Sequence, residues 1–101
     1  MSRKITNDAV HAFRSGFSFS RGNTKVFNDG DTMHMTLHGN RIAYHRKGKL
    51  FINIGGFDSR TTRERLNGLQ GVNVCNKKYE LYLNDEKWDG DWKEIFWNLY
   101  L

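Results

Sequence analysis

The stretch "TMHMTLHGNRIAYHRKGKLFINI", Thr32 to Ile54, holds the pattern that decides the fold. Its first seven residues alternate strictly between two faces. One face carries the apolar residues Met33, Met35 and Leu37. The other carries His34, Thr36 and His38. This two-residue period predicts a β-strand with one buried face.

A turn at Gly39-Asn40 is the first reversal that we predict, because both residue types tolerate positive φ. Folding back across it makes two apolar pairs, Leu37 with Ile42 and Met35 with Tyr44. On the opposite face it pairs His38 with Arg41 and His34 with His45. The apolar faces of the two strands then coincide, so we expect the cationic side chains to point outward.

Further reversals follow along the chain. A three-residue loop, Lys47-Gly48-Lys49, would pair Tyr44 with Ile52 and Ile42 with Ile54. A two-residue turn at Asn76-Lys77 would place Val72 and Val74 opposite Leu81 and Tyr79. Two more turns are expected at Asn84-Asp85 and Asp89-Gly90. The apolar segment "WKEIFWNLYL", residues 92–101, is expected to be buried as a final strand or docked on the sheet.

Two short helices complete the prediction. Thr6 or Asn7 can cap a helix over residues 8–15 that Gly16 ends. Thr61 and Glu64 have the spacing of a capping box for a helix over residues 62–67, with Leu66 and Leu69 inward and Gly68 at its end. The expected fold is α+β: a single domain, residues 1–101, with a curved antiparallel sheet of about five to six strands and both helices packed on it.

Charge favours an acidic partner. The chain of 101 residues carries a net charge of +5 at a pI near 9.6. Residues 1–50 hold nine Lys or Arg against three acids, whereas residues 51–101 hold seven against eight, which indicates a basic face. Apolar runs are too short to span a membrane and the start lacks a signal-peptide centre, so we expect an intracellular protein without a membrane partner. The lone Cys75 leaves no internal disulfide.

The sequence predicts neither a metal site nor a cofactor. His34 and His38 would lie about 13 Å apart on a strand, too far to share an ion. The carboxylate pairs fall in turns, where Asp commonly bonds the backbone. No Ser-His-Asp arrangement is legible, and Cys75 has no evident base. We therefore predict that the protein is not an enzyme.

Basic residues form the candidate binding site. One group lies on the central hairpin and its loop, and the other surrounds the second helix start: Arg41, His45, Arg46, Lys47, Lys49, Arg60, Arg63 and Arg65. Together they suit phosphate groups or an acidic protein surface. The alternative is a solvated polar face that keeps the sheet soluble. Trp88, Trp92 and Trp97 suit either stacking on bases or burial in a core.

The order of the motifs resembles a small domain family found among bacteriophage proteins. The resemblance spans about residues 22–92 and rests on "GNTKV", "LHGNRIA", "INIGGFDSRTTRERLNGL", "YLN" and "WDGDW". Phe57 stands where tryptophan is more usual, and Ser59-Arg60 where a Thr-containing pair is expected. The resemblance implies a phage origin and the host cytoplasm, and it assigns no catalytic residue.

Two functions follow from these observations. The first is a non-enzymatic protein that engages or inhibits a host protein or nucleoprotein complex, such as a defence or nucleic-acid-processing machine. The second is direct binding of DNA or RNA by the basic hairpin and helix start. The oligomeric state is open between a monomer and a homodimer. The apolar segment "FWNLYL" would favour the homodimer.

Overall fold

The computed structural model describes residues 4–56 and 58–96 as two helices and two antiparallel sheets. The helices are α1 (Lys4–Ser15) and α2 (Arg60–Asn67). The larger sheet contains β1 (Phe19–Arg21), β2 (Thr24–Asp29), β3 (Thr32–Leu37), β4 (Asn40–Arg46), β5 (Lys49–Ile52) and β9 (Lys93–Phe96). The smaller sheet contains β6 (Val74–Lys77), β7 (Glu80–Leu83) and β8 (Glu86–Lys87). The predicted α+β class is confirmed.

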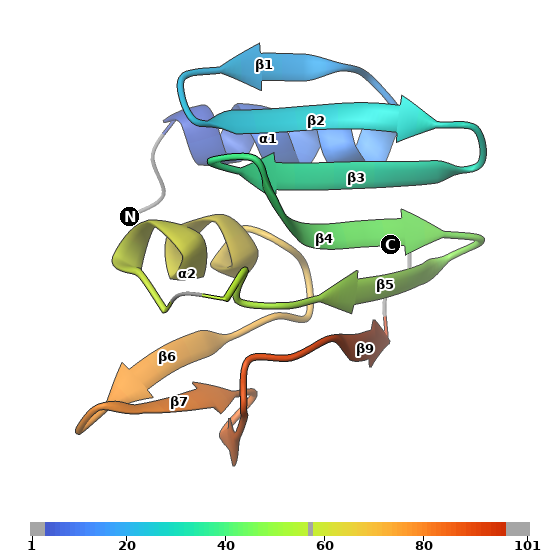
Figure 1. Ribbon diagram of the computed structural model, residues 1–101. Helices are drawn as coiled ribbons and strands as arrows, with labels where there is room; N and C mark the ends of the chain where they lie inside the picture. The colour runs from blue at the N-terminus through green and yellow to red at the C-terminus, as the bar shows by residue number, and fades with distance from the viewer. Residues whose placement is uncertain (1–3, 57, 97–101) are drawn as a thin grey trace.

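The larger sheet has the strand order β1-β2-β3-β4-β5-β9. Its first five strands form a meander, and β9 returns from the far end of the chain to pair with β5 (Figure 1). The six strands agree with the five to six expected. Residues 74–87 do not extend this sheet, because they form the separate three-stranded sheet at the lower end of Figure 1.

The reversal between β3 and β4 differs from the prediction. Leu37 pairs with Asn40, so the turn residues are His38 and Gly39, at φ 53° and 80°. A two-residue hairpin turn with positive φ at both positions matches the twist of the flanking strands, and Gly is well suited to the second position. The predicted turn at Gly39-Asn40 was therefore wrong by one residue.

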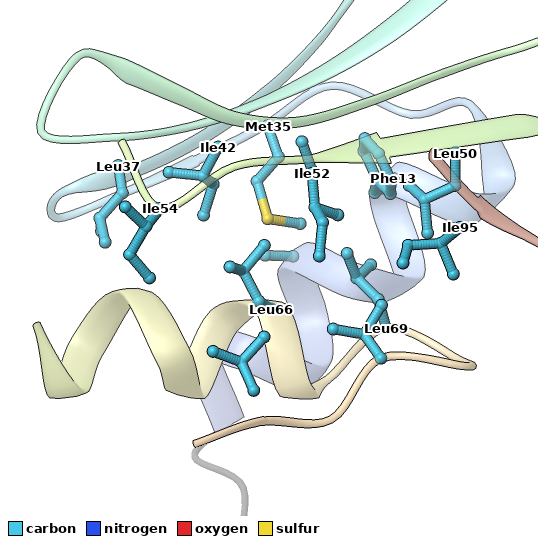
Figure 2. Close-up of a cluster of buried hydrophobic side chains, with 14 of the residues drawn as sticks. Phe13, Met35, Leu37, Ile42, Leu50, Ile52, Ile54, Leu66, Leu69 and Ile95 are labelled. Atoms are coloured by element: carbon cyan, nitrogen blue, oxygen red, sulfur yellow. The ribbon is translucent and has the colours of Figure 1, made fainter. Parts of the chain in front are cut away.

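A β-bulge follows this turn. Thr36 pairs with Arg41, but the next pair is Met35 with Ala43, so Ile42 is the extra residue on β4. Ile42 and Ala43 are consecutive and both are buried. Figure 2 shows Ile42 in the layer between the sheet and the helices, as Met35 is. The predicted pairs Leu37 with Ile42 and Met35 with Tyr44 were thus wrong.

Asn53 and Gly55 hold the bulge in place. The Asn53 side-chain amide donates to the Arg41 carbonyl (3.1 Å), and its backbone N–H donates to the Ile42 carbonyl (2.9 Å). Gly55 is at φ 76°, and a Cβ there would lie 3.2 Å from Ile42 Cγ2. Glycine is therefore suited to this position by both its conformation and the space it leaves for Ile42.

The other predicted turns had mixed outcomes. The β4–β5 turn has two residues, Lys47 and Gly48, because Arg46 pairs with Lys49; the three-residue loop was wrong. The β6–β7 turn lies at Lys78-Tyr79 and pairs Val74 with Leu83, so the reversal at Asn76-Lys77 was wrong as well. The turn at Asn84-Asp85 is confirmed by the pair Leu83 with Glu86. The chain also bends at Gly90.

Both helix ends were predicted correctly and both starts were not. Gly16 follows α1 at φ 86°, and Gly68 is the C-cap of α2. Thr6 does not cap α1, because it lies inside the helix and is buried there. The N-cap of α2 is Ser59, whose hydroxyl accepts from the Thr62 N–H (3.1 Å), rather than Thr61.

The core lies between the larger sheet and the two helices. Met35, Ile42, Leu50 and Ile52 point from the sheet toward Phe13 of α1 and Leu66 of α2, and Leu69 lies beside them (Figure 2). Leu66 and Leu69 were predicted to be inward, which is confirmed. Ile95 is buried and brings β9 into this core, which agrees with the final strand expected in the C-terminal segment. Residues 97–101 of that segment lie outside the described residues. No helix among the described residues is long and apolar enough to cross a membrane.

Candidate functional site

The side of the larger sheet opposite the two helices, here called the outer face, carries a row of four rings. The bulge reverses the alternation of β4, so Tyr44 points outward although Ile42 points inward. Cross-strand pairing then aligns Phe27 with His34, His34 with Tyr44, and Tyr44 with Phe51. This aromatic row crosses β2, β3, β4 and β5.

The rings of the aromatic row contact one another. Phe27 and His34 stack with centroids 5.0 Å apart, and Tyr44 and Phe51 stack at 4.9 Å. His34 and Tyr44 join these two pairs at 6.2 Å. Aromatic pairs of this geometry stabilise a sheet and fix the ring orientations. Phe27 at one end of the row is nevertheless 36% exposed.

Arg41 and Trp92 complete the centre of the outer face. Trp92, which directly precedes β9, packs its ring edge-on against Tyr44 at 5.0 Å and is 39% exposed. The Arg41 guanidinium lies 5.0 Å from the Tyr44 ring centroid and 5.1 Å from that of Trp92. A guanidinium over two rings is a cation–π arrangement that holds the charge at the surface.

His34 is buried within the aromatic row. Arg41 Nη1 donates to its Nδ1 at 3.3 Å, so the ring hydrogen is on Nε2. Burial, helped by the charge of Arg41 and opposed by Asp29, lowers the pKa of His34 and keeps the ring neutral. Nε2 is buried with no hydrogen-bond partner among the described residues, because Asp29 Oδ2 is 3.8 Å away.

Cations border the aromatic row on both sides. Lys25 pairs with Thr36 on the outer face, and Arg46 and Lys49 form the last pair before the Lys47-Gly48 turn. All four cations, Lys25, Arg46, Lys47 and Lys49, are exposed. Acids are present too: Asp31 accepts from Arg46 Nε at 3.1 Å, and Glu94 pairs with Phe51. The outer face is thus most positive in two places, around Lys25 and Arg41 and at the Lys47-Gly48 turn. Near Asp31 the charge of Arg46 is neutralised by the ion pair.

The structure brings together four of the eight predicted site residues: Arg41, Arg46, Lys47 and Lys49. Arg60 and Arg63 lie apart from them on α2. Arg63 forms an ion pair with Asp58, and Arg60 is exposed. The predicted single basic surface is therefore divided between the outer face and the start of α2.

His45 belongs to the inner face, which corrects its predicted place in the basic cluster. The bulge turns it toward α1, where its Nε2 donates to the Phe13 carbonyl at 2.7 Å and its ring packs edge-on against Phe13 at 4.7 Å. Burial lowers the pKa of His45, although the bond to Phe13 opposes this. The residue is a neutral link between sheet and helix.

Arg65 is also a correction, because it is only 2% exposed. Its Nε donates to Thr24 Oγ1 at 3.0 Å, and its Nη1 donates to Thr6 Oγ1 at 2.6 Å and Glu64 Oε1 at 2.7 Å. Thr6 Oγ1 in turn donates to Glu64 Oε1 at 3.0 Å. This network joins α1, α2 and β2, so Arg65 stabilises the fold and is not available to a ligand.

Sequence reasoning missed Lys25, Phe27, Tyr44 and Phe51 as members of the site. Strict alternation in "TKVFND" (residues 24–29) places Lys25 and Phe27 on the same face, which was an available signal. Tyr44 was assigned to the core because the bulge was not foreseen. Trp92 was expected either to stack on a ligand or to be buried, and the structure leaves it partly exposed on the outer face.

A hollow of about 860 Å³ lies beside β8 and β9. Its walls include Trp88 and Trp92, together with four acids and two lysines. Negative walls do not suit a polyanion inside this hollow. Trp92 borders the outer face as well, where Arg41 lies over its ring. Among residues 4–56 and 58–96, no three His, Cys, Asp or Glu side chains come together as a metal site.

Comparison with known families explains the resemblance seen in the motifs. Residues 2–98 match the Kyanoviridae Gp96 protein family, whose members come from cyanophages. The chain belongs to this family. The expected phage origin is therefore confirmed. Neither a curated protein nor a solved structure matches the chain.

Proposed function

We propose that this phage protein is a non-enzymatic nucleic-acid-binding protein of the host cytoplasm whose contact surface is the outer face. The observation that supports the proposal is the combination of partly exposed rings with cations on one side of one sheet. Cations attract the phosphate backbone, and rings offer surfaces on which bases stack. The helices pack on the opposite side of the larger sheet, so the outer face is the side of this sheet that they leave uncovered.

Salt dependence of binding tests this proposal. Five cations, Lys25, Arg41, Arg46, Lys47 and Lys49, would give a slope of log affinity against log salt of roughly −3 to −4 if most of them contact phosphates. Arg46 already forms an ion pair with Asp31, so a slope of about −3, the weaker salt dependence, is expected. Binding measured by fluorescence anisotropy between ~50 and ~200 mM salt gives this slope. Affinity that does not change with salt would contradict the proposal.

A charge-matched control locates the surface. The double variant Lys25→Glu/Lys49→Glu should weaken binding strongly, since it reverses two charges on the outer face. Lys77→Glu/Lys78→Glu makes the same change in net charge at the exposed tip of the β6–β7 hairpin, and it should have a small effect. Equal losses in the two variants would show that only net charge matters and that the outer face is not the site.

One feature favours the second candidate function, a contact with a host protein complex. Tyr79 at the β6–β7 tip is 98% exposed and has φ 68°, and its neighbour Lys78 has φ 51°. Non-glycine residues at positive φ are strained, and exposed tyrosines are frequent anchors at protein interfaces. Tyr79→Gly removes the ring and suits the backbone, so it should abolish capture of a host complex while leaving nucleic-acid affinity unchanged. Retention of the captured complex by Tyr79→Gly would exclude this contact.

Both candidates are consistent with a monomer or a homodimer acting without a membrane. The outer face and the β6–β7 tip are each present on a single copy of the chain, so neither proposal needs a second subunit. Sedimentation of the full chain at ~10 and ~100 μM decides between the two states, because dimerisation depends on protomer concentration.

A further inference from the structure

We propose that the outer face takes single-stranded nucleic acid and holds it by stacking unpaired bases on the rings of the aromatic row and Trp92. This inference rests on the proposed function and narrows its ligand class. It is carried by the placement of the rings, by the balance of charge around them and by the unsatisfied nitrogen of His34.

The placement of the rings suits unpaired bases. Strands in a sheet are about 4.8 Å apart, so the aromatic row extends about 14 Å across β2, β3, β4 and β5. A sheet surface of this width with rings on neighbouring strands can stack two or three bases of a single strand. In a duplex the bases are already stacked on each other, and the rings would have nothing to contact.

The balance of charge argues against a ligand bound through phosphates alone. The cations of the outer face share it with Asp29, Asp31 and Glu94, and Arg46 is paired with Asp31. Duplex binding without base contacts depends on many unopposed cations. Stacking supplies additional affinity for each base that is largely independent of salt, so a face of modest charge can still bind a single strand.

Arg41 and the ring contacts keep the site preorganised. Arg41 is held over Tyr44 and Trp92, and Tyr44 is held against Phe51. Side chains fixed before binding lose little conformational entropy when a ligand arrives. Phe27 and Trp92, the two exposed large aromatics among these residues, are therefore the rings that bases should reach first.

His34 adds a polar group that lacks an acceptor. Its Nε2–H is buried next to Phe27, while Arg41 occupies Nδ1. A buried donor without an acceptor is unfavourable. A carbonyl or phosphate oxygen of a ligand would satisfy it once the Phe27 ring, which stacks on His34, moves aside. Asp29 Oδ2, the nearest carboxylate oxygen, belongs to a largely exposed side chain and is too distant to serve.

The test compares strands and variants in one anisotropy assay at ~50 mM salt. The ligands are labelled oligonucleotides of about 12 nucleotides, poly-dT, poly-rU, and a mixed-sequence duplex of the same length. The single strands should bind at least about tenfold more tightly than the duplex. Poly-dT and poly-rU show whether DNA or RNA is preferred.

Aromatic variants test stacking directly. Phe27→Leu and Trp92→Leu should each weaken single-strand binding at least about fivefold without changing the salt slope, because phosphate contacts remain. Phe17→Leu is the matched control, since Phe17 is an exposed ring after α1 and outside the aromatic row. Trp92→Phe keeps a ring and should retain most of the affinity. Thermal unfolding confirms that each variant is folded.

Three outcomes would overturn the inference, and they separate it from the proposed function. Equal affinity for the single strands and the duplex, or full affinity in Phe27→Leu and Trp92→Leu, removes the stacking site but leaves nucleic-acid binding intact. Absence of binding to every oligonucleotide removes both.

Discussion

The bulge at Ile42 predicts that two residues only two positions apart respond very differently to truncation. Ile42 is 1% exposed and packs toward the helices, so Ile42→Ala leaves a cavity in the core. Comparable buried truncations cost about 2–5 kcal/mol. Ile42 Cγ2 lies 3.2 Å from where a Gly55 Cβ would be, so its surroundings are closely packed and we expect about 3 kcal/mol.

Tyr44→Ala should cost less. The half-buried ring loses its contacts with Phe51, Trp92 and Arg41, which amounts to about 1–1.5 kcal/mol for cross-strand and ring pairs. Urea unfolding of both variants measures the difference, which should exceed about 1 kcal/mol. Lysine replacements make the contrast sharper: Tyr44→Lys should fold and Ile42→Lys should not, because only the former side chain reaches solvent.

An unbulged hairpin would place both residues on the same face. The two alanine variants would then have similar costs, and Tyr44→Lys would unfold the protein. Either result would refute the assignment of the outer face. Asn53→Ala is a useful companion, since it removes the donor to the Arg41 carbonyl and should cost about 1 kcal/mol without affecting the core.

Three further predictions concern the interior. Arg65→Leu should lower the free energy of unfolding, measured by urea titration, by about 3 kcal/mol, because it removes the bond to Thr24 and leaves Glu64 without the guanidinium. The nucleic-acid affinity of the folded variant should stay the same. Arg65→Lys should recover part of the lost stability. Gly68→Ala should cost about 1–3 kcal/mol, because the new Cβ would lie 2.7 Å from Thr6 Cγ2, and a neutral result by thermal unfolding would contradict the close approach of α1 and α2. The contribution of His34 and His45 to the free energy of unfolding should be fully present above pH 6.5 and should decrease as the pH falls below it. Both histidines have lowered pKa values in the folded chain, so the unfolded chain takes up protons first. His45→Gln should weaken this pH dependence in urea titrations between pH 7 and pH 5, and an unchanged profile would count against a neutral buried His45.

The sequence was sufficient for the strands of the central meander because their side chains alternate with a period of two. It was insufficient for the register, because His38-Gly39 and Gly39-Asn40 are both reasonable turns and differ only in where Gly39 sits. The bulge depends on Asn53 and Gly55, which lie more than ten residues beyond Ile42. A local pattern therefore could not reveal that the alternation reverses between Ile42 and Tyr44.

The candidate site shows the same limit. Arg41, Arg46, Lys47 and Lys49 were predictable because they are close together in one hairpin. Arg65 was not, since its partners Thr24 and Thr6 are 41 and 59 residues away in the chain. The sequence around α2 shows that position 65 is an arginine. It cannot show that the hydroxyls of Thr24 and Thr6 and the carboxylate of Glu64 surround the guanidinium. Long-range contacts of this kind separate a structural arginine from a surface one.

An NMR titration of the isotope-labelled full chain with poly-dT of about 12 nucleotides is the most direct test of the outer face as the binding surface. Binding at the outer face predicts that shifts concentrate on Phe27, Arg41, Tyr44 and the Trp92 indole N–H, while Arg65 and His45 stay unchanged. Shifts confined to α2 or to the β6–β7 hairpin, or no shifts at all, would contradict it.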